Sequence, residues 1–415
     1  MDASGEPAMT SDKSGPPSRF RNIVLQLSLA TGSVLVVLFV VEIVLRITTP
    51  KEIMRYFFVA PDRTLHHRFM PNASGRYRST EFNTEYRINS LGLRDREFPV
   101  EKPPQTVRVL MLGDSFTEGD GVESNETFSK LIEAQLRSAV PGNRVEVINA
   151  GVGSYSPILE YLYLKTEGLR LNPDLVVLNL DLSDFYDDIN YSMLATLDSA
   201  GVPLGVSPGG TPEEEHGIAT KVKDFFKDHT RIYNFIRLRI NRYIEGVRHE
   251  GNFTGDLRYD KYAMLRDNHA TADDSEWSLS YRYLLLIRDF LRDRGIDLWI
   301  TVYPYGQQVS PKEWNVGRRF WGFKPDTLYS IQPQGFVEAF CVRSGIHVVN
   351  MCQQMRDSSR TVFPLYLSDN GHWTPRGHEV VAAILKSELE PYLRNRFASA
   401  RKGEPVTESS TQGRN

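Results

Sequence analysis

Short runs of apolar and β-branched residues alternate with amphipathic stretches along most of the chain. The apolar runs predict five strands, over residues 107–112, 144–150, 174–182, 297–304 and 346–351. The amphipathic stretches predict helices at Glu126–Ala139, Pro157–Gly168, Ser278–Arg294, Pro333–Ser344 and Pro375–Arg394. This alternation is typical of a parallel sheet with helices on both faces, so it predicts one α/β domain over residues 105–394.

One segment near the start is apolar without interruption by a basic residue. Ile23–Leu45 contains no Lys or Arg, and its 23 residues are followed by no Ala-x-Ala-like cleavage site. As a helix it would span about 35 Å, enough to cross a hydrocarbon core of about 30 Å. We therefore interpret residues 22–47 as an uncleaved transmembrane anchor rather than a signal peptide. Glu42 and Arg46 are four residues apart near its end and are expected to pair.

The charges that flank this segment do not decide its orientation. Three basic residues precede it and three follow it: Lys13, Arg19, Arg21, Arg46, Lys51 and Arg55. A short head before the anchor favours a single-pass protein with its large domain outside the cytosol. Residues 1–21 and 395–415, which are rich in small and polar residues, are predicted to be a disordered cytosolic head and a disordered tail.

Two further stretches interrupt the α/β rhythm. Residues 48–104 form a lead-in between the anchor and the first strand of the domain. Residues 190–275 contain "PGGTPEEE" followed by an apolar and basic run, and are interpreted as an insertion that forms a lid or a docking surface.

Composition narrows the class of function. The chain has 415 residues, of which 40% are hydrophobic and 24% charged, as in a globular protein. Its formal net charge of −3 and the absence of a long basic run argue against binding nucleic acid. The two cysteines, Cys341 and Cys352, would form either a disulfide or buried thiols. They form no metal-binding motif, so neither a metal nor a cofactor is predicted.

A serine at the end of the first predicted strand carries the candidate chemistry. "GDSFTEG" places Ser115 in a turn, where it would need a histidine as base and a third group to orient that histidine. Of nine histidines, His372 has an Asp three residues earlier, Asp369. Thr374 and Pro375 then predict a helix start. Both junctions lie at the carboxyl ends of parallel strands, where ligand crevices form.

Other polar residues allow two interpretations. His378 is expected to make a structural hydrogen bond. The acidic residues Asp184, Asp187 and Asp188 could bind a cation or be solvated carboxylates. The aromatic and polar residues in 303–308 and 313–323 suit sugar binding or core packing equally well.

The motifs "GDSFTEG" and "DNGHWTPRGH" resemble those of the SGNH (GDSL-like) hydrolases, and the resemblance covers Arg87 to Leu393. "INSLGLRDREFP", "VINAGVGSYSP" and "LDLSD" resemble a branch of membrane-anchored bacterial members. The resemblance implies a flavodoxin-like three-layer α/β/α fold with a parallel five-stranded sheet. It also implies that Ser115 is the nucleophile, His372 the general base and then acid, and Asp369 the orienting residue.

The family's oxyanion hole maps onto four positions of this chain. The backbone N–H of Ser115 and that of Gly153 or Ser154 are implied donors. Ser183 stands where the family has an asparagine side chain, and its hydroxyl is shorter. Loss of one oxyanion donor costs about 2.7 to 4 kcal/mol of transition-state stabilisation.

The resemblance and the anchor together predict a membrane-tethered ester hydrolase. Its substrates would be O-acyl esters, foremost O-acetyl esters of a surface or secreted glycan, attacked through an acyl-Ser115 intermediate. Two alternatives remain open. The same residues could transfer the acyl group to an exopolysaccharide hydroxyl, or the chain could be a catalytically weak glycan-binding component of an envelope assembly.

Overall fold

The computed structural model describes residues 19–48, 58–208 and 274–398, together with 222, 225–226, 229–233, 235–237 and 240. The chain divides into two units, Met1–Lys51 with Glu215–Asn241, and Glu52–Glu214 with Arg242–Asn415. Most of the predicted head, most of the predicted tail and much of the predicted insertion lie outside the described residues.

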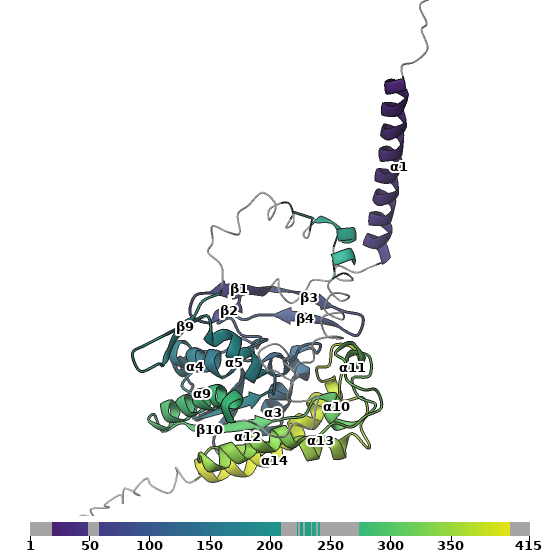
Figure 1. Cartoon of the computed structure of the whole chain (residues 1–415). Helices are drawn as coiled ribbons and strands as arrows, with labels where there is room; N and C mark the ends of the chain where they lie inside the picture. The colour runs from purple at the N-terminus through teal and green to yellow at the C-terminus, as the bar shows by residue number, and fades with distance from the viewer. Residues whose placement is uncertain are drawn as a thin grey trace, which may run out of the picture. The chain divides into compact units, whose positions relative to one another are not determined.

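The first unit is built on the long helix α1 (Arg19–Thr48; Figure 1). Residues Arg21–Ile47 have a mean hydropathy of 2.4, and by length and composition this helix could cross a membrane. A signal sequence near an N-terminus would meet the same criterion. The predicted pair is confirmed, because Arg46 Nε donates to Glu42 Oε1 at 2.8 Å. Glu42 also accepts the backbone N–H groups of Arg231 and Ile232, at 2.9 and 3.0 Å.

The second unit contains a parallel five-stranded sheet, and each of its strands lies where the sequence predicts a strand. Its strand order is β11-β10-β7-β5-β6, and all neighbouring strands run parallel. The strands are β5 (Thr106–Gly113), β6 (Arg144–Asn149), β7 (Leu175–Leu180), β10 (Asp297–Val302) and β11 (His347–Asn350). Numbered along the chain this is the order 2-1-3-4-5 of flavodoxin-like folds. The predicted fold class is confirmed.

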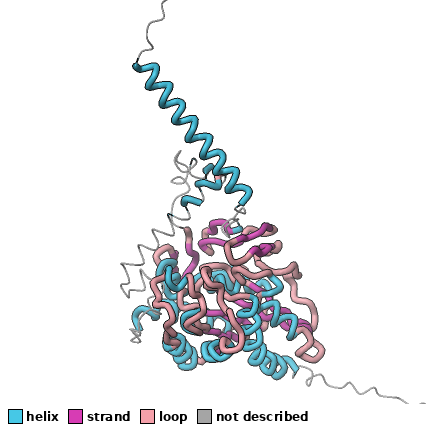
Figure 2. Tube along the Cα trace, turned by 90° about the vertical axis from the view of Figure 1, so that its right-hand side faces the viewer, coloured by secondary structure: helices cyan, strands magenta, loops and turns pink. Residues whose placement is uncertain are grey.

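Helices cover both faces of the sheet, as Figures 1 and 2 show. Helices α3 (Phe128–Leu136) and α14 (Pro375–Ala398) pack together on one face. Helices α4 (Pro157–Thr166), α9 (Asp274–Arg292) and α12 (Gln332–Arg343) form the other layer, in which the rings of Tyr281 and Phe340 stack at 3.8 Å. Every residue of β5 and β7 is buried, which explains why these strands are largely apolar. Their buried polar side chains have partners: Arg108 pairs with Glu146 at 3.0 Å, and Asn179 Nδ2 donates to the carbonyl of Leu112 at 2.8 Å.

The predicted lead-in contributes four strands to the second unit. β1 (Val59–Asp62) pairs antiparallel with β2 (His66–Phe69), and β3 (Ser74–Arg78) pairs antiparallel with β4 (Asn83–Arg87). Phe69 and Tyr86 are fully buried in the same hydrophobic core as the five-stranded sheet. These strands therefore form part of the packed structure around the sheet.

Smaller elements complete the described chain. They are α2 (Ser115–Glu118), η2 (Ser124–Glu126), η3 (Gly168–Leu171), α5 (Asp184–Ser192), β8 (Ala195–Leu197), β9 (Pro203–Val206), α10 (Gly306–Val309), α11 (Gly317–Phe320) and α13 (Cys352–Ser358). β8 and β9 form a hairpin within the predicted insertion.

Helix α14 runs four residues further than the predicted end at Arg394. The reason is a set of contacts with the start of β10. Asp297 accepts hydrogen bonds from Tyr392 Oη and from Arg396 Nε, the latter at 3.2 Å. Phe397 packs against the hydrophobic core.

Cys341 and Cys352 are free, buried thiols in the structure. Burial raises the pKa of the Cys341 thiol to about 12. Of the two alternatives for these residues, the structure shows the buried thiols.

Candidate active site

Ser115 begins the short helix α2 directly after β5. Asp114 caps this helix, because its carboxylate accepts the N–H of Phe116 at 2.9 Å. The turn also needs Gly113, whose φ of +148° lies outside the usual range of L-residues and whose Cβ would lie 2.2 Å from Thr117 Oγ1. The strand-to-helix corner therefore holds the half-buried Ser115 at the carboxyl edge of the sheet.

His372 reaches the same edge from the other end of the sequence. It lies in the loop before α14, where Thr374 Oγ1 accepts the N–H of Gly377 at 3.1 Å, and Pro375 is the first helical residue. The predicted helix start is confirmed. The indole of Trp314 donates to the carbonyl of Asp369 at 3.0 Å, and Glu81 accepts the N–H groups of Asp369 and Asn370 at 3.0 and 2.8 Å.

The structure brings Ser115 and His372 into hydrogen-bond contact across 257 residues of sequence. Ser115 Oγ lies 2.7 Å from His372 Nε2 and 3.3 Å from Asp114 Oδ2. The His372 ring packs on Phe116, with 4.6 Å between ring centroids. This is the distance at which a histidine can take a proton from a serine hydroxyl.

The other ring nitrogen of His372 meets two side chains that sequence spacing did not single out. His372 Nδ1 forms a hydrogen bond with Asn370 Oδ1, and Asp120 Oδ2 lies 3.8 Å from Nδ1. An amide oxygen can only accept, so Nδ1 carries the proton and Nε2 is free to accept the Ser115 proton. The contacts with Trp314 and Glu81 hold the backbone of Asp369. The role of its side chain in orienting His372 stays a prediction.

The three other residues expected to donate to the oxyanion, Gly153, Ser154 and Ser183, differ in their hydrogen bonds and exposure. The N–H of Gly153 donates to Glu118 Oε2 at 2.8 Å. Ser154 is exposed, has a φ of +61°, and accepts a hydrogen bond from Tyr191 Oη at 3.0 Å through its carbonyl. The N–H of Ser183 donates to Asp181 Oδ1 at 2.5 Å. The amide groups of Gly153 and Ser183 are therefore already hydrogen bonded.

A small cavity of about 70 Å³ opens beside Ser115. Ser183, Asp181, Tyr305 and Trp314 line it together with His372. A cavity of this size has room for water or for a small acyl group. Tyr305 and Trp314 come from the two aromatic segments for which sugar binding and core packing were both open.

The loop after β6, which contains Gly151 and Gly153, approaches α2 very closely. A Cβ on Gly151 would lie 2.3 Å from the backbone nitrogen of Glu118. Asn149 Nδ2 donates to the carbonyl of Thr117 at 2.8 Å. This contact brings Gly153 against the Glu118 carboxylate, which sequence reasoning did not identify as part of the site.

Helices α4 and α5 carry buried carboxyl groups. Asp184, Glu160 and Asp188 are fully buried, and burial raises the pKa values of Asp184 and Glu160 well above their usual range. Burial also raises the pKa of Asp188 to about 7, although Ser156 Oγ and the N–H of Ile158 donate to its carboxylate. The interpretation of Asp184 and Asp188 as solvated carboxylates is therefore wrong.

No group of three or more His, Cys, Asp or Glu side chains in the described part of the chain is arranged to hold a metal ion. Asp184, Asp187 and Asp188 thus form no such group.

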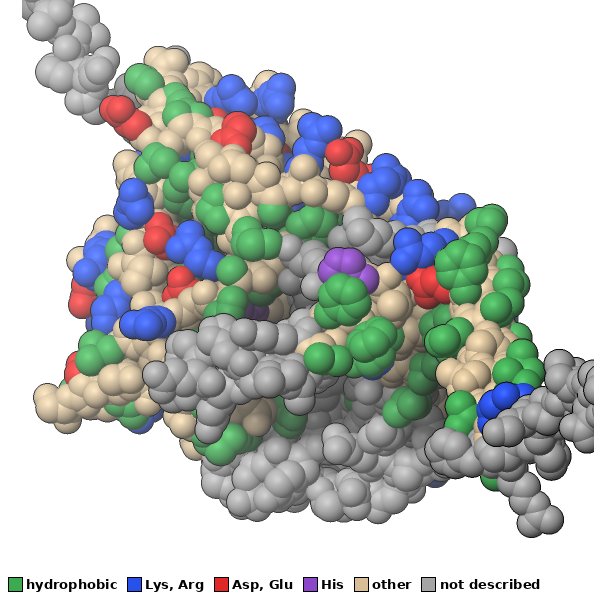
Figure 3. All heavy atoms as spheres, turned by 90° about the horizontal axis from the view of Figure 1, so that it is seen from above, with side chains coloured by type: hydrophobic (Ala, Val, Ile, Leu, Met, Phe, Trp, Pro, Cys, Tyr) green, Lys and Arg blue, Asp and Glu red, His purple; other side chains and the backbone are tan. Residues whose placement is uncertain are grey.

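Figure 3 shows the molecule from above. On the described part of the surface that faces the viewer, acidic side chains lie among basic ones.

His378 has the structural role predicted for it. It is fully buried, and its Nδ1 accepts the N–H of Phe128 at 3.2 Å. Burial lowers its pKa to about 3, so the ring is neutral at pH 7. The hydrogen bond joins α14 to α3.

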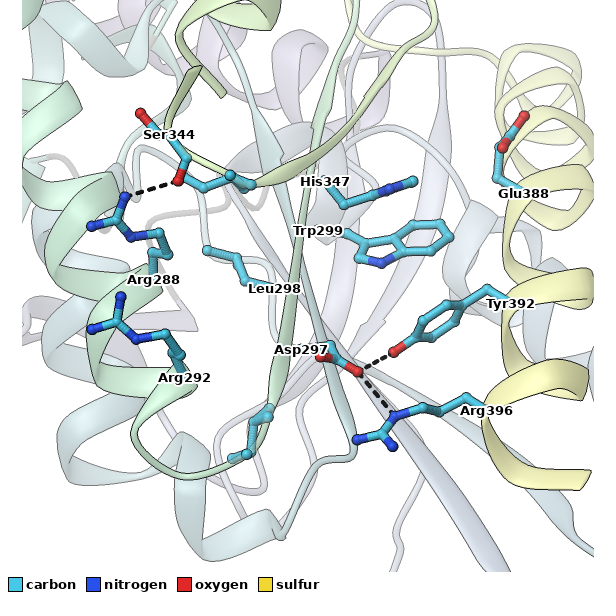
Figure 4. A pocket seen from close by; sticks show the side chains of 14 residues that line it. Arg288, Arg292, Asp297, Leu298, Trp299, Ser344, His347, Glu388, Tyr392 and Arg396 are labelled. Atoms are coloured by element: carbon cyan, nitrogen blue, oxygen red, sulfur yellow. Dashed lines mark hydrogen bonds and ion pairs between the residues drawn. The ribbon is translucent and has the colours of Figure 1, made fainter. Parts of the chain in front are cut away.

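A larger cavity, of about 790 Å³, lies at the opposite edge of the sheet (Figure 4). It is lined by residues at the amino ends of β10 and β11, among them Asp297, Trp299 and His347. The Trp299 ring lies 3.9 Å from that of His347 and 4.8 Å from that of Tyr392, between centroids. Ser115 follows the carboxyl end of β5, so this cavity is separate from the Ser115 site.

No family model matches the chain, and no curated protein matches it significantly. Solved structures do match. A two-domain esterase active on acetylated mannans, crystallised with mannopentaose, is 10% identical with a TM-score of 0.35, and the match covers 70% of this chain. The chain spans about half of that esterase, because the match covers 50% of its length.

Two further structures show the same level of similarity. An acetylxylan esterase mutant from Geobacillus stearothermophilus is 9% identical, with a TM-score of 0.36 over 68% of this chain and 94% of its own. A G-D-S-L family protein from Desulfitobacterium hafniense DCB-2 is 11% identical, with a TM-score of 0.34 over 68% of this chain and 98% of its own. Since these TM-scores are below 0.5, the function proposed below rests on the geometry of the site.

Proposed function

We propose that this protein is a serine ester hydrolase in which Ser115 is the nucleophile and His372 the general base. The observation that carries this proposal is the 2.7 Å contact between Ser115 Oγ and His372 Nε2 at the carboxyl edge of the sheet. Ser115 Oγ attacks the ester carbonyl while His372 takes its proton, and His372 then returns the proton to the departing alcohol. A water activated by His372 hydrolyses the acyl-Ser115 ester and regenerates the serine.

The acyl group in this proposal is small, and acetyl is the first choice. The cavity of about 70 Å³ beside Ser115 accepts a short acyl chain and leaves a bulky alcohol outside. Tyr305 and Trp314 line this cavity but are only 7% and 3% exposed, so the alcohol can meet no more than a small part of each ring. The substrate that we propose, in line with the resemblance of the sequence motifs, is an O-acetylated glycan.

We propose also that α1 anchors the enzyme in a bacterial inner membrane, with the Ser115 site on the periplasmic or extracellular side. The mean hydropathy of 2.4 over Arg21–Ile47 supports the anchor. Full-length protein would then remain in the membrane fraction after washing with carbonate. Release of a shortened chain into the soluble fraction would identify the helix as a cleaved signal instead.

The test of the activity uses the full chain in detergent micelles and p-nitrophenyl acetate. Wild-type protein should release p-nitrophenol and react with a fluorophosphonate probe. Ser115→Ala should lose both reactions, and His372→Ala should lose at least about 10³-fold in kcat/KM. Activity that survives Ser115→Ala would exclude the assigned nucleophile.

A second candidate function is a catalytically weak glycan-binding component. The observation that favours it is the N–H of Gly153, which is hydrogen bonded to Glu118 rather than turned toward a developing oxyanion. In that case the protein would retain acetylated oligosaccharides in a binding assay and would not react with fluorophosphonate. Transfer of the acyl group to an added oligosaccharide, detected by mass spectrometry, would instead identify an O-acyltransferase that uses Ser115.

A further inference from the structure

We propose that Asp120 is the carboxylate that positions His372 and stabilises its ring when the ring is protonated. This inference rests on the proposed function and deepens it. Asp120 Oδ2 lies 3.8 Å from His372 Nδ1, and the Asp120 side chain is only 4% exposed. It lies in the turn directly after α2, where its N–H donates to the carbonyl of Ser115 at 3.0 Å. The same turn therefore carries the nucleophile and this carboxylate.

Asn370 holds the ring of His372 but supplies no charge. Its side-chain oxygen forms a hydrogen bond with His372 Nδ1 and fixes the tautomer. When His372 takes the Ser115 proton, its ring becomes positively charged in a partly buried site. A neutral amide compensates this charge poorly, whereas a carboxylate within 4 Å stabilises it directly. Asp120 supplies this charge from the side opposite the hydrogen bond with Ser115.

The fold holds Asp120 and His372 in this relationship. Gly121, with a φ of +90°, packs so closely that a Cβ would lie 2.6 Å from Leu367 Cδ1. The N–H of Leu367 donates to the carbonyl of His372 at 2.8 Å. The turn after α2 is thus packed against the loop that carries the histidine, and neither Asp120 nor His372 can move far without breaking this contact.

Other charged or titratable groups surround His372. Asp114 Oδ2 lies 3.3 Å from Ser115 Oγ, and Asp369 and Glu81 lie in and against the histidine loop. His378 on α14 is buried and neutral, while Arg94 donates to the carbonyls of Glu118, Gly119 and Val122 in the turn that contains Asp120. Asp369→Asn is the comparison for Asp120→Asn, because it makes the same chemical change at the residue that the resemblance assigns to orienting His372. Asp293→Asn, at an exposed side chain, is the control.

The test measures kcat/KM for p-nitrophenyl acetate from pH 5 to 9, with the full chain in detergent micelles. Asp120→Asn should lower the plateau about 10- to 100-fold and move the midpoint of the acid limb about one pH unit lower. Asp369→Asn should lower the plateau by a smaller factor than Asp120→Asn does, whereas Asp293→Asn, at a side chain that is 66% exposed, should leave the plateau and the midpoint in place. A larger effect of Asp369→Asn than of Asp120→Asn would assign the role to Asp369 and overturn the proposal.

A rescue variant separates this role from a structural one. The double variant Asp120→Asn with Asn370→Asp places a carboxylate at the hydrogen-bonded position beside Nδ1, and should recover at least about tenfold of the lost kcat/KM. A merely structural role for Asp120 predicts no recovery. Failure to recover, with folding intact by circular dichroism, would count against the proposal.

A measurement without substrate distinguishes failure of this inference from failure of the proposed function. In full-length protein with ¹³C-labelled histidine rings, the His372 signal is the one missing in His372→Gln. Its titration midpoint should move about one pH unit lower in Asp120→Asn, whether or not the protein hydrolyses esters. An unmoved midpoint would overturn the role of Asp120, whereas a wild-type protein inert to esters and fluorophosphonate would overturn the hydrolase.

Discussion

The carboxylate of Glu118 accepts the N–H of Gly153 at 2.8 Å, so the helix that begins with Ser115 is hydrogen bonded to the loop after β6. The other carboxylate oxygen of Glu118 accepts the hydroxyl of Tyr86 at 3.0 Å, and the side chain is fully buried. An amide expected to bind an oxyanion is thereby engaged in holding the site together. In the proposed mechanism, stabilisation of the oxyanion then falls to the backbone N–H of Ser115 and the side-chain hydroxyl of Ser183, two residues that line the cavity.

Substitutions at Glu118 should separate stability from catalysis. Glu118→Ala leaves the Gly153 N–H and the Tyr86 hydroxyl without an acceptor, and each buried unsatisfied group costs about 1 to 3 kcal/mol. We expect a fall in the melting temperature of several degrees. Glu118→Gln keeps one acceptor and should change kcat/KM less than about threefold. A tenfold gain in Glu118→Gln would show that Gly153 is an oxyanion donor held back by the carboxylate.

His378→Asn should leave hydrolysis in place. The asparagine oxygen can accept the N–H of Phe128 as His378 Nδ1 does, although the smaller side chain leaves space between α14 and α3. We expect a lower melting temperature and a kcat/KM within about threefold of wild type. The comparison is His372→Ala, which should lose activity with little change in melting temperature. An unchanged melting temperature with lost activity would place His378 in the chemistry instead.

The stability of the protein should fall as the pH rises from about 4 to 7. Burial raises the pKa of Asp188 to about 7 in the folded protein, against an ordinary value of 3.8, so the folded state binds this proton more tightly than the unfolded chain does. Its stabilising effect is present below pH 3.8 and is lost as the pH passes through 7. The raised pKa values of Glu160 and Asp184 act with the same sign.

Asp188→Asn should therefore flatten the dependence of the melting temperature on pH between 4 and 8. Each pKa unit corresponds to about 1.4 kcal/mol, so the effect should reach a few kcal/mol. Asp293→Asn is the control, because the side chain of Asp293 is 66% exposed. Identical slopes for the wild type and Asp188→Asn would contradict the assignment of the titrating group.

Arg94 should be required for the shape of the turn that follows α2. Its guanidinium donates to the carbonyls of Glu118, Gly119 and Val122 at 2.9, 2.6 and 2.5 Å, and lies 3.9 Å from the centroid of the Tyr86 ring. A lysine ammonium cannot reproduce this planar geometry. Arg94→Lys should lower the free energy of unfolding by roughly 2 to 4 kcal/mol.

The same substitution should also lower kcat/KM by about tenfold, because the turn carries Asp120 and follows Ser115. Arg87→Lys, at an exposed position in β4, provides the control and should leave both quantities near wild type. Equal melting temperatures for these two variants would contradict the role given to the Arg94 guanidinium. Thermal unfolding by circular dichroism and steady-state kinetics on the same preparations measure both effects.

The amino-acid sequence by itself determined the order of the elements and the class of the fold. Strands β5 and β7 are buried on both faces, and such strands are mostly apolar, which makes them visible in the pattern. The corner at Ser115 was also predictable, since Gly113 and Asp114 are required by the turn itself. The start of α14 followed from Thr374 and Pro375 in the same way.

Tertiary structure alone decided which groups surround the serine and the histidine. The spacing of Asp369 and His372 does not determine where a side chain points in a loop, and here Asn370 and Asp120 meet His372 Nδ1. Likewise, no local pattern shows that Glu118 meets Gly153, 35 residues away. These contacts depend on packing between segments distant in sequence, such as Gly121 against Leu367, and that packing exists only once the sheet has brought its carboxyl ends together.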